Sequence, residues 1–196
     1  MNGPTRRELL IAGAGAALIA PGTAQAAVGP HSASVPVPER LRRLVQLEML
    51  LLFCYRYVLH SSILSRRAER TLQPFVAHEE AHIHALERQL TARGGRIPSP
   101  PAGVAAANRD LAHRKVGGRL GQLRGDLDAI RLLLTTEQVT IGAYFVALTT
   151  LQDSDLIELA CQIMANEAQH DAMLGLLLPP GKIQAAVPYG LVQGLQ

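Results

Sequence analysis

The amino-acid sequence predicts an all-α protein built from two similar helical hairpins. Leucine and alanine are abundant, only 4% of the residues are aromatic and tryptophan is absent, a composition that favours helices over a β-sandwich or a barrel. Four long segments place apolar residues at three- and four-residue steps, which is the spacing of one helix face. The length of 196 residues and the hydrophobic fraction of 48% suit one globular domain, and no second domain is expected.

Residues 1–26 are predicted to be an export signal outside this domain. Arg6 and Arg7 resemble a twin-arginine signal, and they precede a short apolar run and a small-residue cleavage site that ends at Ala26. The alternative is a membrane anchor, but about twelve apolar residues are too few to span a bilayer, which takes roughly 20. We therefore expect twin-arginine export to the periplasm, the cell envelope or the medium, and a mature chain with no transmembrane helix.

A proline-rich, extended lead-in over residues 27–38 is predicted to precede the first helix. That helix is expected over residues 39–64, where Glu48 falls on the apolar face rather than on the wet one. An acid in such a place needs a partner. The inward positions of this helix are Leu41, Leu44, Val45, Glu48, Leu51, Leu52, Tyr55 and Leu59.

The second helix is expected over residues 72–93, after a charged connection at residues 65–70. Thr71 is its expected N-terminal cap, and Pro74 is expected in the first turn, where a missing N–H group costs little. The glycines that follow the helix are a typical end signal. The inward positions are Phe75, Glu79, His82, Leu86 and Leu90, whereas Glu80, His84, Glu87 and Arg88 fall mostly outside them.

Residues 94–120 are interrupted by glycines and prolines and show only a weak pattern. They could link two domains, but neither hairpin could bury its helices alone, so a long crossover within one bundle is predicted. The third helix is expected over residues 122–151 and the fourth over residues 154–178, followed by a tail of unknown role at residues 179–196. Inward positions are Ile130, Leu133, Leu134, Glu137, Ile141, Tyr144, Phe145 and Leu148 in the third helix, and Leu156, Leu159, Ala160, Ile163, Glu167, His170 and Leu174 in the fourth.

The two halves of the chain share a pattern of acids, tyrosines and histidines. Each half carries a lone glutamate in an apolar helix, a tyrosine seven positions later, and a Glu-x-x-His motif 31 or 30 positions after the lone glutamate. The residues are Glu48, Tyr55, Glu79 and His82 in the first half, and Glu137, Tyr144, Glu167 and His170 in the second. The second copy is offset by 88 or 89 positions, which favours a duplicated hairpin.

One glutamate from each of two helices and a Glu-x-x-His from each of the other two resemble the ligand set of the ferritin-like di-iron or di-manganese carboxylate proteins. The full six-residue pattern is specific, although a single Glu-x-x-His is weak. The resemblance implies a ferritin-like four-helix bundle over residues 39–178 that holds two iron ions, or alternatively manganese. The implied metal ligands are Glu48, Glu79, His82, Glu137, Glu167 and His170.

The resemblance also implies a role for each ligand. Glu79 and Glu167 bridge the two ions, Glu48 and Glu137 are terminal ligands, and each histidine binds one ion. The residue types agree with these roles, because side chains three positions apart on a helix share a face and can hold one ion together. Four carboxylates offset the charge of two divalent cations. An oxygen-rich donor set with two histidines suits iron or manganese better than a closed zinc site.

Taken singly, each acid could be a solvated helix position and each histidine a satisfied core or surface group. Four acids centred on four apolar faces together favour the metal site. His78 and His84, which flank the first motif, are predicted at the surface. Tyr55 and Tyr144 are predicted to be core tyrosines with a hydrogen bond, in preference to a redox role or a place beside the metals.

The two cysteines are predicted to be free, buried thiols. In a crossover-linked bundle the first and fourth helices run parallel, so Cys54 and Cys161 lie on opposite sides of the metal layer. Their twelve-position separation along the bundle corresponds to roughly 18 Å, which is far beyond the reach of a disulfide.

The leading functional prediction is an exported protein that oxidises Fe(II) or reacts with dioxygen or peroxide, with no catalytic residue beyond the metal ligands. The alternative is a non-enzymatic envelope protein for stress tolerance or metal sequestration, since one fold serves many functions. The chain has no Cys-x-x-Cys pair, so it carries no rubredoxin-type electron-transfer module. A formal charge of +3 with scattered arginines argues against a nucleic-acid partner. A homo-oligomer is compatible with the sequence, but nothing marks the shell interface of an iron-storing cage.

Overall fold

The structure is a computed structural model that describes residues 35–179. The predicted export signal and nearly all of the predicted tail lie outside the described residues. Every regular element between residues 35 and 179 is helical, as predicted. The elements are α1 (Val37–His60), α2 (Arg66–Ala92), α3 (Val104–His113), a short 3₁₀ helix η2 (Leu120–Gln122), α4 (Asp126–Leu148) and α5 (Ser154–Leu177). No helix in the described part of the chain is long and apolar enough to cross a membrane.

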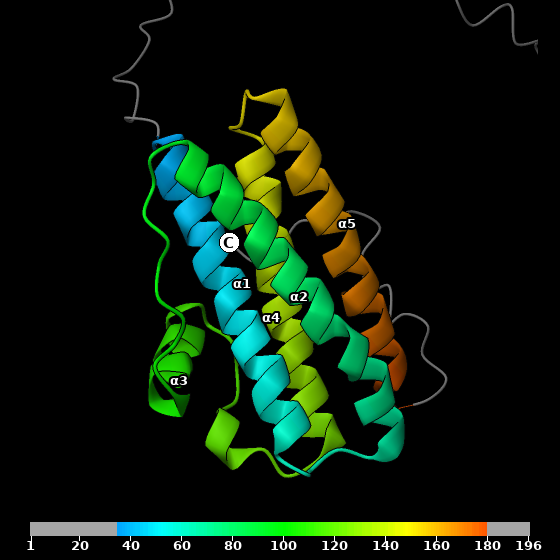
Figure 1. Ribbon diagram of the computed structural model, residues 1–196. Helices are drawn as coiled ribbons and strands as arrows, with labels where there is room; N and C mark the ends of the chain where they lie inside the picture. Colours follow the sequence, from blue (N-terminus) through cyan, green and yellow to red (C-terminus); the bar gives the residue numbers. More distant parts are fainter. Residues whose placement is uncertain (1–34, 180–196) are drawn as a thin grey trace, which may run out of the picture. The chain divides into compact units, whose positions relative to one another are not determined.

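The four long helices form two antiparallel hairpins that pack side by side (Figure 1). α1 and α2 make the first hairpin, and α4 and α5 make the second. The chain between them returns along the outer side of α1 to the opposite end of the bundle, so that α1 and α5 run in the same direction (Figure 1). The predicted four-helix bundle of two hairpins joined by a long crossover is therefore confirmed.

The start of α2 differs from the prediction, because the helix begins at Arg66 rather than near residue 72. Ser65 is the N-cap, and its side chain accepts a hydrogen bond from the N–H group of Ala68. The N–H group of Ser65 donates in turn to Asp126 at 2.6 Å, which ties the cap to the start of α4. The Thr71 hydroxyl does not cap a helix but donates to a carbonyl one turn back.

Pro74 consequently lies inside α2 instead of in its first turn. A proline inside a helix leaves one carbonyl of the preceding turn without its N–H donor. Pro74 and Arg70, four positions earlier, are both exposed, so water can bond that carbonyl. The extra turns also bury Ala68 in the core, which offsets part of the lost hydrogen bond.

The crossover contains a helix that the sequence analysis missed. α3 buries Ala107 and Leu111 against the bundle, beside the lower half of α1 in Figure 1. The side chain of Asn108 accepts a hydrogen bond from the N–H group of Leu120 at 2.9 Å, which links α3 to η2. Its ten residues offer only two fully buried apolar positions, too few for a clear periodic pattern among the surrounding glycines and prolines.

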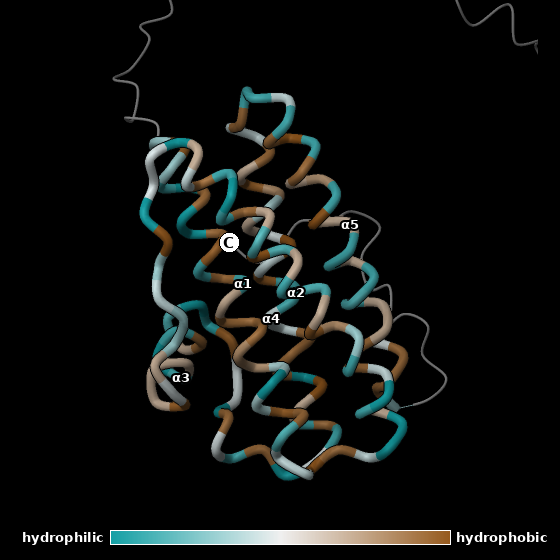
Figure 2. The backbone as a smooth tube through the Cα atoms, in the orientation of Figure 1, coloured by the Kyte–Doolittle hydropathy of each residue, from teal (hydrophilic) through white to brown (hydrophobic). Residues whose placement is uncertain are grey.

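The core of the bundle consists of two apolar clusters. The lower cluster includes Leu51, Leu72 and Leu133, and the upper cluster includes Val45, Leu86 and Ile163. Figure 2 shows apolar positions recurring along all four long helices. Phe145, which was predicted to point inward, is 40% exposed because it follows the buried Tyr144 on the outer side of α4.

Candidate metal centre

Six acidic and histidine side chains from all four long helices meet in the interior, between the two apolar clusters. They are Glu48 of α1, Glu79 and His82 of α2, Glu137 of α4, and Glu167 and His170 of α5. The four glutamates are 0% exposed, and the histidines are 8% and 1% exposed. We call these six residues the polar layer. They are the six site residues that the sequence predicted, and the structure brings every one of them together.

The polar layer divides into two overlapping groups that can each hold a metal ion. Within each group, every residue offers a ligand atom within 4.8 Å of the others. One group contains Glu48 and His82, and the other contains Glu137 and His170. Glu79 and Glu167 belong to both groups, so their carboxylates could serve an ion in either one.

Each histidine points its Nδ1 atom at carboxylates from more than one helix. The Nδ1 atom of His82 lies 2.8 Å from Glu167 Oε1 and 3.5 Å from Glu48 Oε2. The Nδ1 atom of His170 lies 3.1 Å from Glu79 Oε1 and 3.4 Å from Glu137 Oε1. The nearest carboxylate to each ring thus comes from the other Glu-x-x-His motif, so the two motifs interlock across the bundle.

Two buried tyrosines hold the lone glutamates in a reciprocal arrangement. The Tyr144 hydroxyl donates to Glu48 Oε1 at 2.5 Å, and the Tyr55 hydroxyl donates to Glu137 Oε1. Both tyrosines are core residues with a hydrogen bond, as predicted, but their partners are the candidate ligands themselves. Each tyrosine occupies one oxygen of its glutamate, which leaves Oε2 of Glu48 and of Glu137 without a hydrogen-bond partner.

Burial and close packing shift the pKa values of the polar layer in opposite directions. Burial, reinforced by the charge of Glu167, raises the pKa of Glu48 and of Glu137 well above the ordinary value. Burial opposes the charge on Glu167 itself, yet contacts with Glu137 and both histidines hold its pKa below the ordinary range. Burial likewise opposes the charge on the histidines, but contacts with the glutamates outweigh it and raise the pKa of His82 to about 12 and that of His170 to about 11. Protons thus supply positive charge to a site that would otherwise be strongly negative.

The polar layer also contains most of the unsatisfied polar atoms of the core. Nine buried side-chain atoms of residues 35–179 have no hydrogen-bond partner, and eight of them belong to the six residues of this layer. All six residues are represented, including both Nδ1 atoms and both oxygens of Glu79 and Glu167. Buried polar atoms normally have partners. Oxygen and nitrogen atoms that converge with so few hydrogen bonds are an arrangement that a cation can satisfy.

The sequence model of a family described as ferritin-like domain matches residues 39–179 of the chain. The chain belongs to the ferritin-like domain family. No curated protein and no solved structure matches it. The family match covers all four long helices, and therefore the whole polar layer, and it leaves out only the first two residues of α1.

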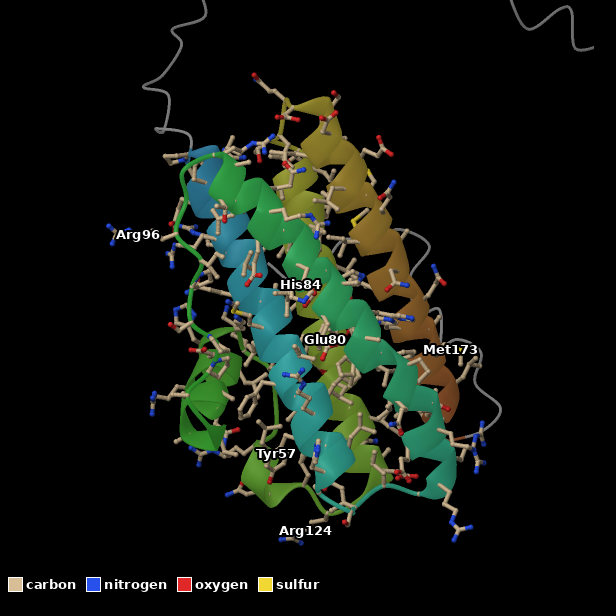
Figure 3. The ribbon with its side chains drawn as sticks, in the orientation of Figure 1. Tyr57, Glu80, His84, Arg96, Arg124 and Met173 are labelled. Carbon is tan, nitrogen blue, oxygen red and sulfur yellow. The ribbon has the colours of Figure 1, made fainter. Side chains whose placement is uncertain are left out.

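One residue at the site of this ferritin-like domain was not predicted to lie there. His78 was predicted at the surface, and its ring is exposed, but its Nδ1 atom lies 2.9 Å from Nε2 of His170. His78 follows the buried Phe75 by three positions and precedes His82 by four, so helical spacing could have indicated that it borders the site. His84, by contrast, is exposed as predicted, and Figure 3 places it on the outer side of α2.

Both cysteines of the ferritin-like domain are free, as predicted. Cys54 is buried in the lower apolar cluster, and burial raises the pKa of its thiol to about 12. The prediction that Cys161 is buried was wrong, because this thiol is exposed. It follows the buried Ala160 directly, so the turn of the helix carries it to the outer side of α5.

Proposed function

We propose that this ferritin-like domain holds a dinuclear iron centre, or alternatively a manganese one, that oxidises Fe(II) or reacts with dioxygen or peroxide. The observation that carries the proposal is the convergence of eight buried, unpartnered ligand atoms from six residues on four helices. The proposed ligands are Glu48, Glu79, His82, Glu137, Glu167 and His170.

The charges of the polar layer support two divalent cations. Four ionised carboxylates carry a charge of −4 with neutral histidines, and burying that charge without compensation is very costly. Two divalent cations balance it and replace the protons that the metal-free site retains. The donor set of carboxylate oxygens and two imidazole nitrogens favours iron or manganese.

The residues of this chain prepare the site before any ion arrives. Tyr144 and Tyr55 fix the lone glutamates by one oxygen and leave the other free for an ion. Glu79 and Glu167 belong to both ligand groups, and both of their oxygens are unpartnered. The apolar clusters on either side keep bulk water away from the polar layer. A pair of redox-active ions bound there would supply the electron transfer that oxidation of Fe(II) or reduction of peroxide requires.

The test is oxygen consumption after metal-free protein is loaded with Fe(II) under anaerobic conditions. Rapid consumption is expected from the wild type, and a Glu79→Gln, Glu167→Gln double variant is expected to fall to the rate of Fe(II) in buffer. The matched control is Glu80→Gln, because Glu80 (Figure 3) directly follows Glu79 but lies outside the layer. There it pairs with Arg56.

Two outcomes would contradict the proposal in different ways. A wild type that binds iron but consumes neither oxygen nor added peroxide would favour the alternative function, a non-enzymatic protein that sequesters metal. If the wild type consumes oxygen no faster than the double variant, the polar layer takes no part in the reaction.

Export by the twin-arginine route is a separate part of the proposal. It is supported by Arg6 and Arg7 ahead of an apolar run and a small-residue cleavage site. An Arg6→Lys, Arg7→Lys variant is expected to accumulate in the cytoplasm as the uncleaved precursor, whereas the wild type is recovered outside it. Equal distribution of the two proteins in cell fractionation would contradict this part alone.

A further inference from the structure

The two histidines of the polar layer are equivalent in sequence but not in their surroundings. The Nε2 atom of His170, on the far side of the ring from the carboxylates, lies 2.9 Å from Nδ1 of His78. The rings of His78 and His170 are nearly parallel, with an interplanar angle of 7°. Phe75 also stacks on His170, with ring centroids 4.0 Å apart. Position and rotation of the His170 ring are thus both restricted.

The contact with His78 also selects one protonation form of His170. A neutral imidazole that binds a cation through Nδ1 must carry its proton on Nε2. In His170 that proton points at Nδ1 of His78, which can accept it as a hydrogen bond. His78 is exposed, so its own N–H group can face solvent. Such outer contacts orient a ligating histidine and raise its affinity for metal.

His82 has no such partner. The residue equivalent to His78 in the second motif is Asn166. Each of the two stands directly before the glutamate of a Glu-x-x-His motif. Within residues 35–179, the hydrogen bond between His170 and His78 is the only one at the Nε2 atom of either histidine, and Asn166 forms none with His82. The side chain of His82 is also more exposed, at 10% against 2% for His170.

We infer that His78 is a positioning residue that makes the two metal positions unequal, so that the position served by His170 binds its ion first and more tightly. The inference rests on the proposed dinuclear site and deepens it, because it assigns an order of filling to the two positions. His78 acts through His170 and does not itself touch the ion.

The test is a stepwise titration of metal-free protein with Co²⁺, followed by its visible absorption and by calorimetry. The wild type is expected to bind in two unequal steps. His78→Ala is expected to weaken the tighter step about 10- to 100-fold and leave the weaker one in place. His78→Asn is expected to restore most of the loss, because the amide oxygen of asparagine can accept a hydrogen bond where Nδ1 of histidine does. Asn166→Ala, the matched control in the other motif, is expected to titrate like the wild type.

A second variant separates a hydrogen bond to His170 from a general effect on the fold. In a His170→Ala background, His78→Ala is expected to have no further effect on Co²⁺ affinity, since residues in contact act non-additively. Unchanged titration of His78→Ala in the wild-type background would overturn this inference while leaving the proposed dinuclear site intact. Equal losses in His78→Asn and His78→Ala would overturn the hydrogen-bond account. No Co²⁺ binding by the wild type would overturn both the inference and the proposed site.

Discussion

The polar layer and the apolar clusters on either side of it are buried to the same degree, but burial has opposite consequences for them. In the clusters, side chains such as Leu51 and Leu72 gain free energy when they leave water. In the polar layer, Glu48 and Glu79 lose hydration and gain few hydrogen bonds in return. Apolar residues at these positions would often give a more stable protein. The polar layer therefore lowers the stability of the metal-free bundle. A cation bound to its unpartnered atoms would offset that loss.

Among single substitutions, the largest expected effect on stability lies in the clusters and does not depend on metal. Leu51→Ala removes a side chain that is 0% exposed and leaves a cavity in the lower cluster. The free energy of unfolding is expected to fall by about 2–5 kcal/mol, with or without metal. Leu176→Ala is the control, because Leu176 is 54% exposed. Denaturant unfolding of both variants measures the difference. If adding metal restored the unfolding free energy of Leu51→Ala, the apolar clusters would not be independent of the metal site.

Metal should stabilise the protein only through the polar layer. A divalent ion at about 100 times its dissociation constant is expected to raise the free energy of unfolding by about 2.7 kcal/mol. The midpoint of thermal unfolding should rise accordingly for the wild type with Mn²⁺. It should not move for the Glu79→Gln, Glu167→Gln double variant. If Mn²⁺ raised the unfolding midpoint of both proteins equally, the ion would bind outside the polar layer.

The pH dependence of the metal-free protein should also come from the layer. The raised pKa values of His82, about 12, and His170, about 11, stabilise the fold fully below the ordinary histidine value of about 6.5. That contribution is lost as the pH rises from about 6.5 toward the raised pKa values, by about 1.4 kcal/mol per pH unit for each proton retained. The raised pKa values of Glu48 and Glu137 act in the same direction from about 4.5 upward. The lowered pKa of Glu167 acts oppositely and is lost in acid.

Metal-free protein is therefore expected to be most stable near pH 4–5 and to lose stability progressively toward pH 9, as measured by urea unfolding between pH 4 and 9. Bound metal should displace the protons and flatten the profile. A metal-free profile that stays flat between pH 6 and 9 would contradict the proton-for-cation exchange.

The smallest of these effects concerns the tyrosines at the border between layer and cluster. Tyr144→Phe and Tyr55→Phe keep the ring but leave Oε1 of Glu48 or of Glu137 without a donor. Each change is expected to cost about 1–2 kcal/mol, because a buried acceptor loses its partner. Since the two contacts are reciprocal, the two costs should be similar in denaturant unfolding. A clear cost in only one variant would show that the two halves of the bundle are not equivalent at this level.

The helices and the six residues of the layer were predictable because each depends on local spacing. Apolar residues at three- and four-residue steps define one face, and Glu48, Glu79, Glu137 and Glu167 lie on that face. The duplicated order of glutamate and Glu-x-x-His then distinguished a shared site from isolated buried acids. The helical period placed these residues on inward faces, and the resemblance to the ferritin-like ligand set implied that they share one site.

The features that were not predicted depend on contacts between distant parts of the chain. Ser65 begins α2 because Asp126, 61 positions later, bonds it. His78 borders the site because His170 lies across the bundle, 92 positions away. α3 is stabilised by packing on α1 rather than by its own pattern. Spacing indicates which face of a helix is inward, but it does not indicate which residues of the neighbouring helix contact that face.

The most direct test of the central claim is the metal content of the folded protein, measured by elemental mass spectrometry after reconstitution with Fe(II) or Mn²⁺. We expect about two ions per chain in the wild type and in Glu80→Gln. We expect none in a Glu79→Ala, Glu167→Ala double variant that retains its helical circular dichroism. A wild type that folds without metal and cannot be reconstituted, or a double variant that still holds two ions, would contradict the assignment of the polar layer as a dinuclear metal site.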